Sequence, residues 1–440
     1  MTPFIQLSEK DYLSLHSVFE GLHCFGQTGS GKSSAVLRAY MRSCLLHKFG
    51  GAIFCPKPQD ASDAVALIRQ MGREKDIILL GPGHPATVNI LEHELKRGGV
   101  ENAIHTLTAI SDIAEGRSGP DGGDAFWPRS AAQLNRAALA LQNLAGNDIS
   151  LTSLIRFIAD LPRDYKQMGE EGWRKRSFAY QTSTTARAAA KNQMEAQSFE
   201  VAETYVTASF PGYGDRTQGS ITATLVSAID PLLYGEPWRI LSNQTTVLPE
   251  QAYTEGKIFV FDMDLANHGE AGRLCQNLFK YVFQRQMLRR GLNKRPVFLV
   301  CDEAHYFISP FDFRFQSVAR SYLVSTFYLT QNMANYRAML SNNAVDALLG
   351  SLTTHIYCCN TDTDTNRYAA ERIGRRWQMK TGFSGGDGHA SASGSQHLEY
   401  EVEPHQFALL PTHNPFGAIV YRAGLFSNGR NWLPVAFQRG

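Results

Sequence analysis

Cysteine is scarce in this 440-residue chain, and the arrangement of its seven thiols excludes two uses for them. No two cysteines stand in a Cys-x-x-Cys spacing, and none is spaced with histidine as metal ligands usually are. An odd number of thiols, most of them inside apolar runs, is typical of reduced core residues. We therefore expect a cytoplasmic protein whose cysteines form neither a disulfide framework nor a metal site.

Long hydrophobic runs and an excess of charge are also missing. No stretch approaches the ~18 uninterrupted apolar residues of a membrane helix, and residues 1–20 lack the apolar segment of a signal peptide. Because 43 Lys and Arg stand against 41 Asp and Glu, the net charge is only +2. This balance excludes a wholesale basic coating of DNA, so nucleic-acid contact requires a local patch or an oligomeric channel.

Short apolar runs that end at polar or Gly/Pro residues indicate buried parallel strands. The first two, at 21–26 and 50–57, flank a helical pattern at 32–48, which makes a strand–turn–helix–strand unit. Five more strands are expected in segments 76–80, 257–262, 296–302, 325–330 and 354–359. The order predicts an α/β fold with a mainly parallel sheet.

The texture changes between about residues 100 and 234, where Ala, Leu, Gln and Arg dominate and β-branched runs almost vanish. Turn signals, among them 118–123, divide this block into several helices. We therefore predict a discontinuous nucleotide-binding domain at 1–105 and 240–440, interrupted by an all-α insertion domain at 106–239. The Gly-, Ser- and Ala-rich segment 382–396 is predicted to be a mobile loop.

A glycine-rich turn follows the first of these strands and fits the pattern GxxxxGK[ST] completely. Its glycines let consecutive backbone N–H groups face phosphate oxygens, and the following helix adds its positive N-terminal end. The lysine would neutralise the β- and γ-phosphates, and the serine after it would offer its hydroxyl to Mg²⁺. The residues expected to bind ATP are Gly26, Gln27, Thr28, Gly29, Ser30, Gly31, Lys32, Ser33 and Ser34.

A second group of candidates lies where two later strands end. Asp302 and Glu303 follow the apolar run Val297–Cys301, and ligands of α/β sheets bind at such strand ends. We expect Asp302 to hold Mg²⁺ together with Ser33, and Glu303 to orient and deprotonate the attacking water. Asp262 also ends an apolar strand but has no acidic neighbour, so a structural role is more common. Gln331 ends the next strand and could contact the γ-phosphate or position water. A polar residue that only faces solvent at a strand end is about equally common.

Hydrolysis in such sites commonly uses an arginine that neutralises charge in the transition state. Arg320 stands eleven residues before Gln331 and is the first candidate; the cluster Arg372, Arg375 and Arg376 is the second. Each of these arginines is individually more often a surface charge. A ring oligomer would supply such a residue from a neighbouring subunit.

Several motifs together resemble the FtsK/HerA superfamily of DNA-pumping ATPases, and within it the TraG/TraD-type coupling proteins of type IV secretion and conjugation. The likeness covers most of the chain and rests on the phosphate-binding turn, Asp302-Glu303, Ile53-Phe-Cys-Pro-Lys57, Phe126-Trp127, Gly219-Ser-Ile221, Ala319-Arg-Ser-Tyr322, Gln331 and the segment Glu403–Pro411. The resemblance implies a RecA-like P-loop motor domain, an all-α domain, a hexameric ring and DNA in the central channel.

The chain departs from this family in two places. Coupling proteins generally begin with transmembrane helices, whereas this chain begins almost at the P-loop strand, and Cys55 stands where the family usually has Asp before Pro-Lys. We therefore expect no direct membrane insertion, and a cytoplasmic relative recruited to the inner membrane face by secretion-system or membrane partner proteins.

A local basic region could contact DNA. Segment 156–191 holds eight basic and four acidic residues, with Trp173, Phe178 and Tyr180 interleaved. Such a segment could face phosphates and stack bases, although a solvated helix face is the commoner outcome. The sequence thus predicts a ring-forming ATPase that moves DNA or a nucleoprotein. The alternative is a nucleotide-gated assembly or scaffold ATPase that docks partner proteins and pumps no DNA.

Overall fold

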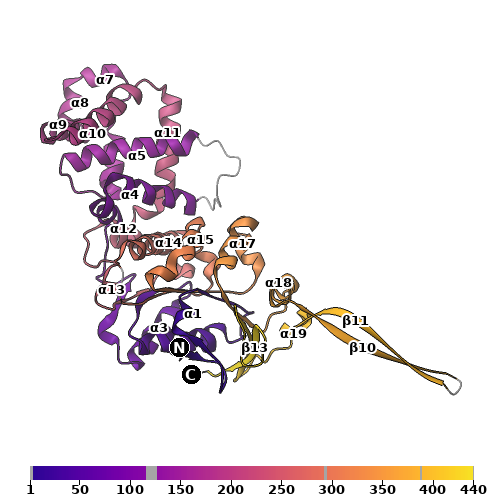
Figure 1. The fold of residues 1–440 in the computed structure, drawn as a ribbon. Helices are drawn as coiled ribbons and strands as arrows, with labels where there is room; N and C mark the ends of the chain where they lie inside the picture. Colours follow the sequence, from indigo (N-terminus) through magenta and orange to yellow (C-terminus); the bar gives the residue numbers. More distant parts are fainter. Residues whose placement is uncertain (1–2, 115–125, 292–294, 387–388, 440) are drawn as a thin grey trace.

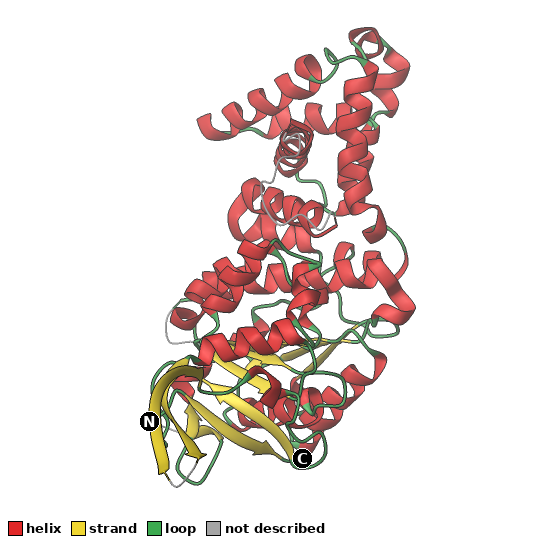
Figure 2. Ribbon diagram, turned by 90° about the vertical axis from the view of Figure 1, so that its right-hand side faces the viewer, coloured by secondary structure: helices red, strands yellow, loops and turns green. Residues whose placement is uncertain are grey.

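A computed structural model describes residues 3–114, 126–291, 295–386 and 389–439. The helical part, α4 to α12, stands above an α/β part that contains both chain termini (Figure 1). Turned by 90°, the same molecule shows its strands gathered at the base and helices filling the rest (Figure 2). The turn signal predicted at 118–123 lies outside the described residues.

The α/β part is built on a nine-stranded sheet with the order β13-β12-β9-β3-β8-β7-β4-β6-β5. Seven neighbouring strands, from β9 to β5, run parallel, and β12 and β13 add an antiparallel edge. The parallel strands are the seven that the sequence predicts. The strands are β3 (Leu22–Phe25), β4 (Gly50–Phe54), β5 (Ile77–Leu80), β6 (Ile258–Phe261), β7 (Val297–Cys301), β8 (Val324–Thr330), β9 (Thr354–Cys358), β12 (Phe416–Tyr421) and β13 (Trp432–Phe437).

Helices cover both faces of this sheet, which explains why its strands are apolar without alternation. On one face, α2 (Arg38–Leu46) and α3 (Pro58–Gln70) pack against the strands in a common core cluster. On the other face lie α14 (Leu265–Arg289), α15 (Pro310–Ala319), α17 (Asn342–Ser351) and α18 (Thr363–Ile373). Short helices complete this part: α1 (Leu15–Val18), α13 (Gln251–Thr254), α16 (Met333–Arg337) and α19 (Pro404–Phe407).

The helical part follows β5 in the chain and returns before β6. Its first helix bends at Gly98 and Gly99, where φ of Gly99 is +72° and L side chains rarely fit. Its buried side chains belong to the same core cluster as those of α14, so the two parts share one continuous apolar contact. The helices are α4 (Ile90–Ala114), α5 (Phe126–Leu144), α6 (Leu151–Ala159), α7 (Tyr165–Gly169), α8 (Glu171–Arg176), α9 (Phe178–Ala189), α10 (Gln193–Thr204), α11 (Asp215–Ile229) and α12 (Gly235–Ser242).

The prediction of a mobile loop at 382–396 is wrong. This segment belongs to a hairpin of β10 (Arg375–Gly386) and β11 (His389–Tyr400), which projects from the α/β part (Figure 1). Twelve cross-strand pairs, from Arg375↔Tyr400 to Gly386↔His389, hold the register, so backbone pairing overrides a composition that favours flexibility. A second hairpin, β1 (Pro3–Gln6) with β2 (Tyr12–Ser14), precedes the sheet.

Candidate nucleotide-binding site

The glycine-rich turn lies at the carboxyl end of β3 and leads into a helical turn, Lys32–Leu37, that continues as α2. Gly29 and Gly31 have φ of +79° and +87°, the left-handed region that glycine tolerates. A Cβ on Gly31 would lie 2.4 Å from the ring of Phe416 on β12, whereas a Cβ on Gly29 would meet nothing within 4 Å. The turn therefore rests against the antiparallel edge at Gly31 and is open at Gly29.

Two polar side chains of this turn are buried without the partners that burial normally demands. The Lys32 side chain is enclosed, and among the described residues its ammonium donates a single long contact, of 3.5 Å, to the carbonyl of Gln27. The Ser30 hydroxyl is buried and has no hydrogen-bond partner among the described residues. A cation and an unused hydroxyl beside an open backbone curve fit the oxygens of a phosphate group.

Asp302 meets the P-loop although their strands are not neighbours, because β8 lies between β3 and β7. The Ser33 hydroxyl donates a hydrogen bond of 2.5 Å to Oδ2 of Asp302. Burial raises the pKa of the Asp302 carboxyl, and the nearby Glu303 raises it further, while Ser33 and Lys32 oppose the change. A hydroxyl and a carboxylate this close, in a buried place, fit the hard oxygen ligands that Mg²⁺ prefers.

Glu303 is held by contacts from three directions. Its backbone is in the left-handed region, with φ of +47°, and its N–H donates to Oδ1 of Asp302 at 3.0 Å. Oε1 accepts from Lys57 Nζ at 3.4 Å and from Gln331 Nε2 at 3.3 Å. A non-glycine residue at positive φ costs free energy and is often found at functional sites.

The second carboxylate oxygen of Glu303, Oε2, is buried and has no hydrogen-bond partner among the described residues. Nδ1 of His305 lies 3.8 Å away, beyond hydrogen-bond reach, and instead contacts the hydroxyl of Thr330 at 3.0 Å. Burial lowers the pKa of His305, and Lys32 and Lys57 add to this, although Glu303 opposes it. A buried carboxylate oxygen without a partner can accept a proton from a water molecule.

Two residues of this constellation, Lys57 and His305, are absent from the prediction. Lys57 follows β4, the strand next to β7, and three carboxylates, those of Glu303, Asp302 and Asp60, raise its pKa against the effect of burial. The sequence shows that Lys57 follows a strand, but only the fold shows that this strand lies beside β7. His305 lies two residues beyond Glu303, and only the turn after β7 brings its ring back to the end of β8.

A pocket of about 250 Å³ opens beside Ser33 and Asp302, between α2, α3 and the strands β4 and β7. Its acidic lining includes Asp60, whose pKa is raised to about 6 by burial and by the charge of Asp302. The backbone N–H of Lys57 donates to Asp60 at 3.2 Å and caps α3. The space next to the Ser33–Asp302 pair is therefore bordered by carboxylates and also by two arginines, Arg38 and Arg439.

The candidate arginines lie elsewhere in the chain's own fold. Arg320 precedes β8, at the opposite end of that strand from Gln331, and pairs with Glu20 at 2.8 Å. Arg372 donates to the carbonyls of Leu349 and Leu352 before β9. Arg375 donates to the Tyr400 hydroxyl at 2.6 Å, and Arg376 lies 3.7 Å from Glu401. Within the described part of the chain, none of these four reaches the P-loop.

Asp262, the competing acid, ends β6 and accepts a contact from His84 Nε2 at 3.0 Å. Two strands away from β7, it does not join the site. Of the remaining predicted residues, Gly26, Gln27 and Thr28 belong to the turn itself, and Ser34 lies in the helical turn that follows it. Gly26 is bound to the neighbouring β8 through the Thr330 carbonyl at 3.3 Å, and a Cβ there would lie 2.5 Å from the Ser30 hydroxyl.

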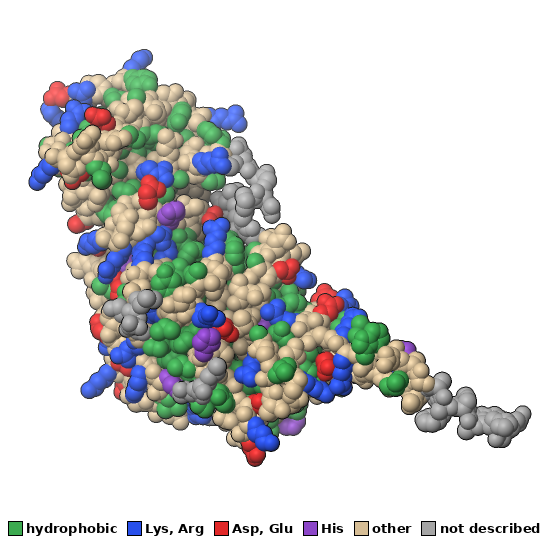
Figure 3. Space-filling model, viewed as in Figure 1, with side chains coloured by type: hydrophobic (Ala, Val, Ile, Leu, Met, Phe, Trp, Pro, Cys, Tyr) green, Lys and Arg blue, Asp and Glu red, His purple; other side chains and the backbone are tan. Residues whose placement is uncertain are grey.

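The basic segment 156–191 lies at the outer end of the helical part, where Lys and Arg side chains are exposed with Asp and Glu among them (Figure 3). Two of these charges are balanced: Lys175 pairs with Glu171 at 2.6 Å, and Arg187 pairs with Glu203. Arg156 stacks on Phe178, with its guanidinium carbon 4.4 Å from the ring centre. The length of the helical part separates this basic end from the sheet edge, by which we mean the carboxyl ends of the parallel strands, where the P-loop and Asp302 lie (Figure 1).

Comparison with known proteins agrees with the fold. A family model described as "TraM recognition site of TraD and TraG" matches residues 296–412. A structure of the bacterial conjugative coupling protein TrwBdeltaN70 with sulphate is similar at a TM-score of 0.69 and 15% identity, over 100% of this chain and 90% of that one. TrwB in complex with a non-hydrolysable ATP analogue has a TM-score of 0.69 and 14% identity, over 100% of this chain and 90% of that one. TrwB with ADP and Mg²⁺ has a TM-score of 0.68 and 15% identity, over 99% of this chain and 91% of that one. No curated protein matches by sequence.

These findings confirm two predictions: the resemblance to TraG/TraD-type coupling proteins, and a RecA-like α/β fold with a helical insertion. The chain has the fold of TrwB along almost its whole length. Among the described residues, no helix combines the length and the hydropathy needed to cross a membrane. All seven cysteines are buried and none forms a disulfide.

Proposed function

We propose that this protein is a ring-forming ATPase that couples ATP hydrolysis to the movement of DNA or a nucleoprotein, as a coupling protein of type IV secretion does. The observation that carries the proposal is the meeting of four side chains at one edge of the sheet. Ser33 touches Asp302 at 2.5 Å, while Lys32 and the free oxygen of Glu303 are buried without strong partners. The relatives with this fold include TrwB structures with an ATP analogue and with ADP and Mg²⁺.

The residues present fit a Mg²⁺–ATP complex. Lys32 would neutralise phosphate charge, the turn from Gly26 to Ser34 would donate its N–H groups, and Ser33 with Asp302 would hold the metal. When bound, Mg²⁺ supplies positive charge to the phosphate oxygens. The raised pKa of Asp302 marks a carboxylate whose charge lacks compensation in this buried place, which a cation would provide.

Glu303 would act as the general base. Its Oε1 is anchored by Lys57 and Gln331, which leaves Oε2 oriented and available to a water molecule. Oε2 would accept the proton of that water as its oxygen bonds to the γ-phosphorus, and the bond from that phosphorus to the β–γ bridging oxygen would break, with ADP as the leaving group. Gln331 would keep Glu303 in place and can donate its other amide proton to a neighbouring oxygen. Lys57 gives the carboxylate a positive partner, with its Nζ 3.4 Å from Oε1.

Arg320 is proposed to act on a neighbouring subunit's nucleotide. Its side chain is more than half exposed and its only described charge partner is Glu20, so it can exchange that surface contact for a phosphate.

We propose that the protein forms a homohexamer with DNA in its central channel. We also propose that each chain is divided into a motor domain at 1–105 and 240–440 and an all-α domain at 106–239. The continuous apolar core between α14 and the helical part offers a path by which the motor can move that domain.

A second candidate function rests on the family model over residues 296–412, whose description concerns recognition of a partner protein. In this alternative, nucleotide binding gates the docking of secretion or membrane partners and no DNA is pumped. Such docking is also the proposed means by which the chain reaches the inner membrane face. The two functions differ in whether DNA itself changes the ATPase rate.

The test is the rate of ATP hydrolysis with and without DNA, measured at low and at moderate salt. The motor function predicts that single- or double-stranded DNA raises the rate and that binding weakens linearly with the logarithm of salt concentration. If both forms of DNA leave the rate unchanged and no salt-dependent binding is found, the motor function is wrong and the docking function remains. Mass measurement of the assembly with and without ATP tests the ring in the same samples.

A further inference from the structure

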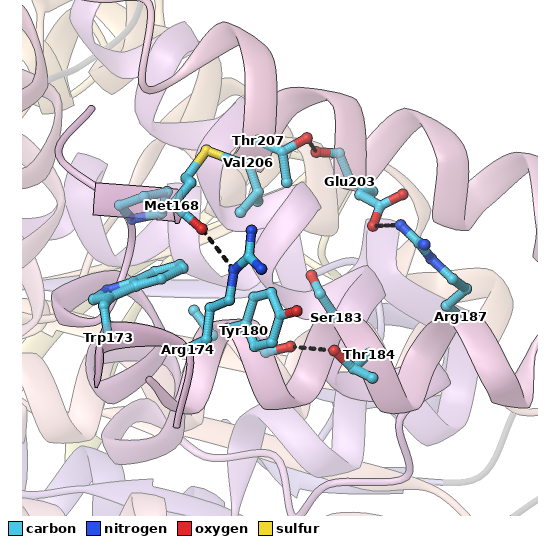
Figure 4. A pocket seen from close by; sticks show the side chains of 12 residues that line it. Met168, Trp173, Arg174, Tyr180, Ser183, Thr184, Arg187, Glu203, Val206 and Thr207 are labelled. Carbon is cyan, nitrogen blue, oxygen red and sulfur yellow. Dashed lines mark hydrogen bonds and ion pairs between the residues drawn. The ribbon is translucent and has the colours of Figure 1, made fainter. Parts of the chain in front are cut away.

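A second pocket lies at the outer end of the helical part, between α8, α9, α10 and the turn that follows (Figure 4). Its volume is about 200 Å³. Trp173 and Tyr180 are in edge-to-face contact there, with ring centres 5.7 Å apart, and Met168 and Val206 form apolar walls. Arg174, Ser183 and Arg187 supply polar groups. Aromatic faces combined with a few directed polar groups are typical of sites for small planar ligands.

One hydroxyl in this pocket has no partner. Ser183 is 7% exposed, and its Oγ forms no hydrogen bond among the described residues. Figure 4 shows this oxygen directed between Tyr180 and Arg187 rather than back into its own helix. The neighbouring Thr184 does bond to its helix, at the Tyr180 carbonyl, 3.0 Å away. A buried hydroxyl left free in this way costs stability unless a ligand uses it.

The two arginines of the pocket differ in how many of their hydrogen-bond donors are unused. Arg187 is committed to Glu203, so its charge is already compensated. Arg174 uses only Nε, which donates to the Met168 carbonyl at 2.7 Å, and its guanidinium lies 5.6 Å from the centre of the Tyr180 ring. Its terminal nitrogens face the interior of the pocket (Figure 4). They form no described hydrogen bond, so they can bind an anion such as a phosphate.

We propose that this pocket binds one nucleobase of single-stranded DNA, with the adjacent phosphate on Arg174. Tyr180 and Trp173 provide the aromatic surface on which a base stacks, and the Ser183 hydroxyl provides a hydrogen bond to its edge. A base paired in a duplex is stacked between its neighbours and cannot enter such a pocket without being flipped out. The eight basic and four acidic residues of segment 156–191 favour a polyanion here over an apolar peptide.

This assignment rests on the proposed function and names the form of DNA that the helical part recognises. The test compares two fluorescein-labelled oligomers of equal length and charge: one of ordinary deoxythymidine residues and one of abasic residues. Binding is measured by fluorescence anisotropy at one salt concentration, with ATP hydrolysis followed in the same preparations. Because stacking on an aromatic side chain contributes substantially for each base, the wild-type protein should bind the ordinary oligomer about 10-fold or more tightly.

Two variants locate the effect. Tyr180→Leu removes the stacking surface and Ser183→Ala removes the free hydroxyl; each should reduce the preference for the ordinary oligomer, Tyr180→Leu nearly abolishing it. Lys175→Gln is the matched control, since Lys175 is exposed on the same helix as Arg174 and does not line the pocket. This variant should leave the preference for the ordinary oligomer at its wild-type value. Unchanged ATP hydrolysis in all three shows that the motor domain is folded.

Two results would overturn the proposal. One is equal affinity of the wild-type protein for the two oligomers, which would show that the DNA backbone alone is recognised. The other is a preference that persists in both pocket variants, which would place base recognition elsewhere. Either result leaves stimulation of ATP hydrolysis by DNA intact, whereas failure of the proposed function abolishes that stimulation with both oligomers.

Discussion

The two polar regions of this molecule are built in opposite ways. At the sheet edge, the functional side chains are buried and hold one another: Ser33 contacts Asp302, and Lys57 and Gln331 contact Glu303. At the outer end of the helical part, most cations are exposed and Arg174 has unused donors. A site that performs chemistry needs positions fixed in advance, whereas a surface that follows a flexible polymer needs charges that adapt.

The difference extends to how each region depends on conditions. The buried carboxyl of Asp302 and the half-buried carboxyl of Asp60 carry raised pKa values and respond to pH and to metal ions. Exposed cations at the helical end respond to salt, because their interactions are screened. Substitutions in one region should therefore leave the other region's response unchanged, and the predictions below rely on that separation.

The largest effect is expected from Lys32→Ala. Loss of the buried ammonium removes the charge that faces the phosphates, so ATP hydrolysis should fall by at least about 100-fold. DNA binding in the absence of nucleotide, measured by fluorescence anisotropy, should stay within error of the wild-type value. A Lys32→Ala protein that loses both activities together would contradict the separation of the two regions.

A glycine pair of the P-loop gives the next largest effect. Gly31→Ala forces a side chain into the left-handed region, at a cost of about 1–2 kcal/mol, and sets its Cβ against Phe416, which adds about 1–3 kcal/mol of overpacking. Gly29→Ala has the same backbone cost but open space. Denaturant unfolding should therefore show a clearly larger loss for Gly31→Ala, with nucleotide affinity reduced in parallel. Equal losses would mean that Phe416 does not support the turn.

Two exposed cations of the helical end test the salt response. Arg163→Gln and Lys166→Gln should each weaken DNA binding and lower the slope of log affinity against log salt by about one. ATP hydrolysis without DNA should not change. Lys75→Gln, an exposed lysine of the α/β part, is the control and should leave the slope as it is. If the slope of log affinity against log salt changed only in the control, the DNA contact would lie on the motor domain instead of the helical part.

The smallest effect concerns pH. The pKa of Asp60 is about 6 in the folded protein, above its ordinary 3.8, so the folded state binds more protons between pH 4 and 6 and stability falls as pH rises through that window. Asp60→Asn removes this loss. Without nucleotide or Mg²⁺, the variant should be more stable than wild type at pH 8 by about 1 kcal/mol and equal to it below about pH 4. A less stable variant at pH 8 would show that the charged carboxylate is favoured.

Much of the sheet edge could be predicted because local sequence encodes it. Each of the seven parallel strands is an apolar run, and residues that follow such strands meet at one edge, which brings Asp302, Glu303 and Gln331 to the P-loop. Lys57 was not assigned, because its contact with Glu303 depends on the order of strands, with β4 beside β7. Strand order is a tertiary property that apolar runs do not reveal.

Other features depend on pairing that composition conceals. The hairpin of β10 and β11 contains the Gly- and Ser-rich segment, in which flexible residues are held by their cross-strand partners. Phe416 supports Gly31 from a strand far along the chain, and no pattern near either residue indicates it. Arg320 lies at the opposite end of β8 from Gln331, so a spacing of eleven residues does not bring the two together within one chain, and its role on a neighbouring subunit stays a prediction.

We propose above all that the residues at the carboxyl ends of the parallel strands hydrolyse ATP with Glu303 as the general base. One paired measurement tests this most directly. ATP binding and ATP turnover are measured for wild type and for Glu303→Gln, a change that keeps the shape of the side chain and removes its basicity. The account predicts nucleotide affinity within about threefold of wild type and turnover lower by about 10²–10⁴-fold. Turnover at the wild-type rate in Glu303→Gln would contradict it.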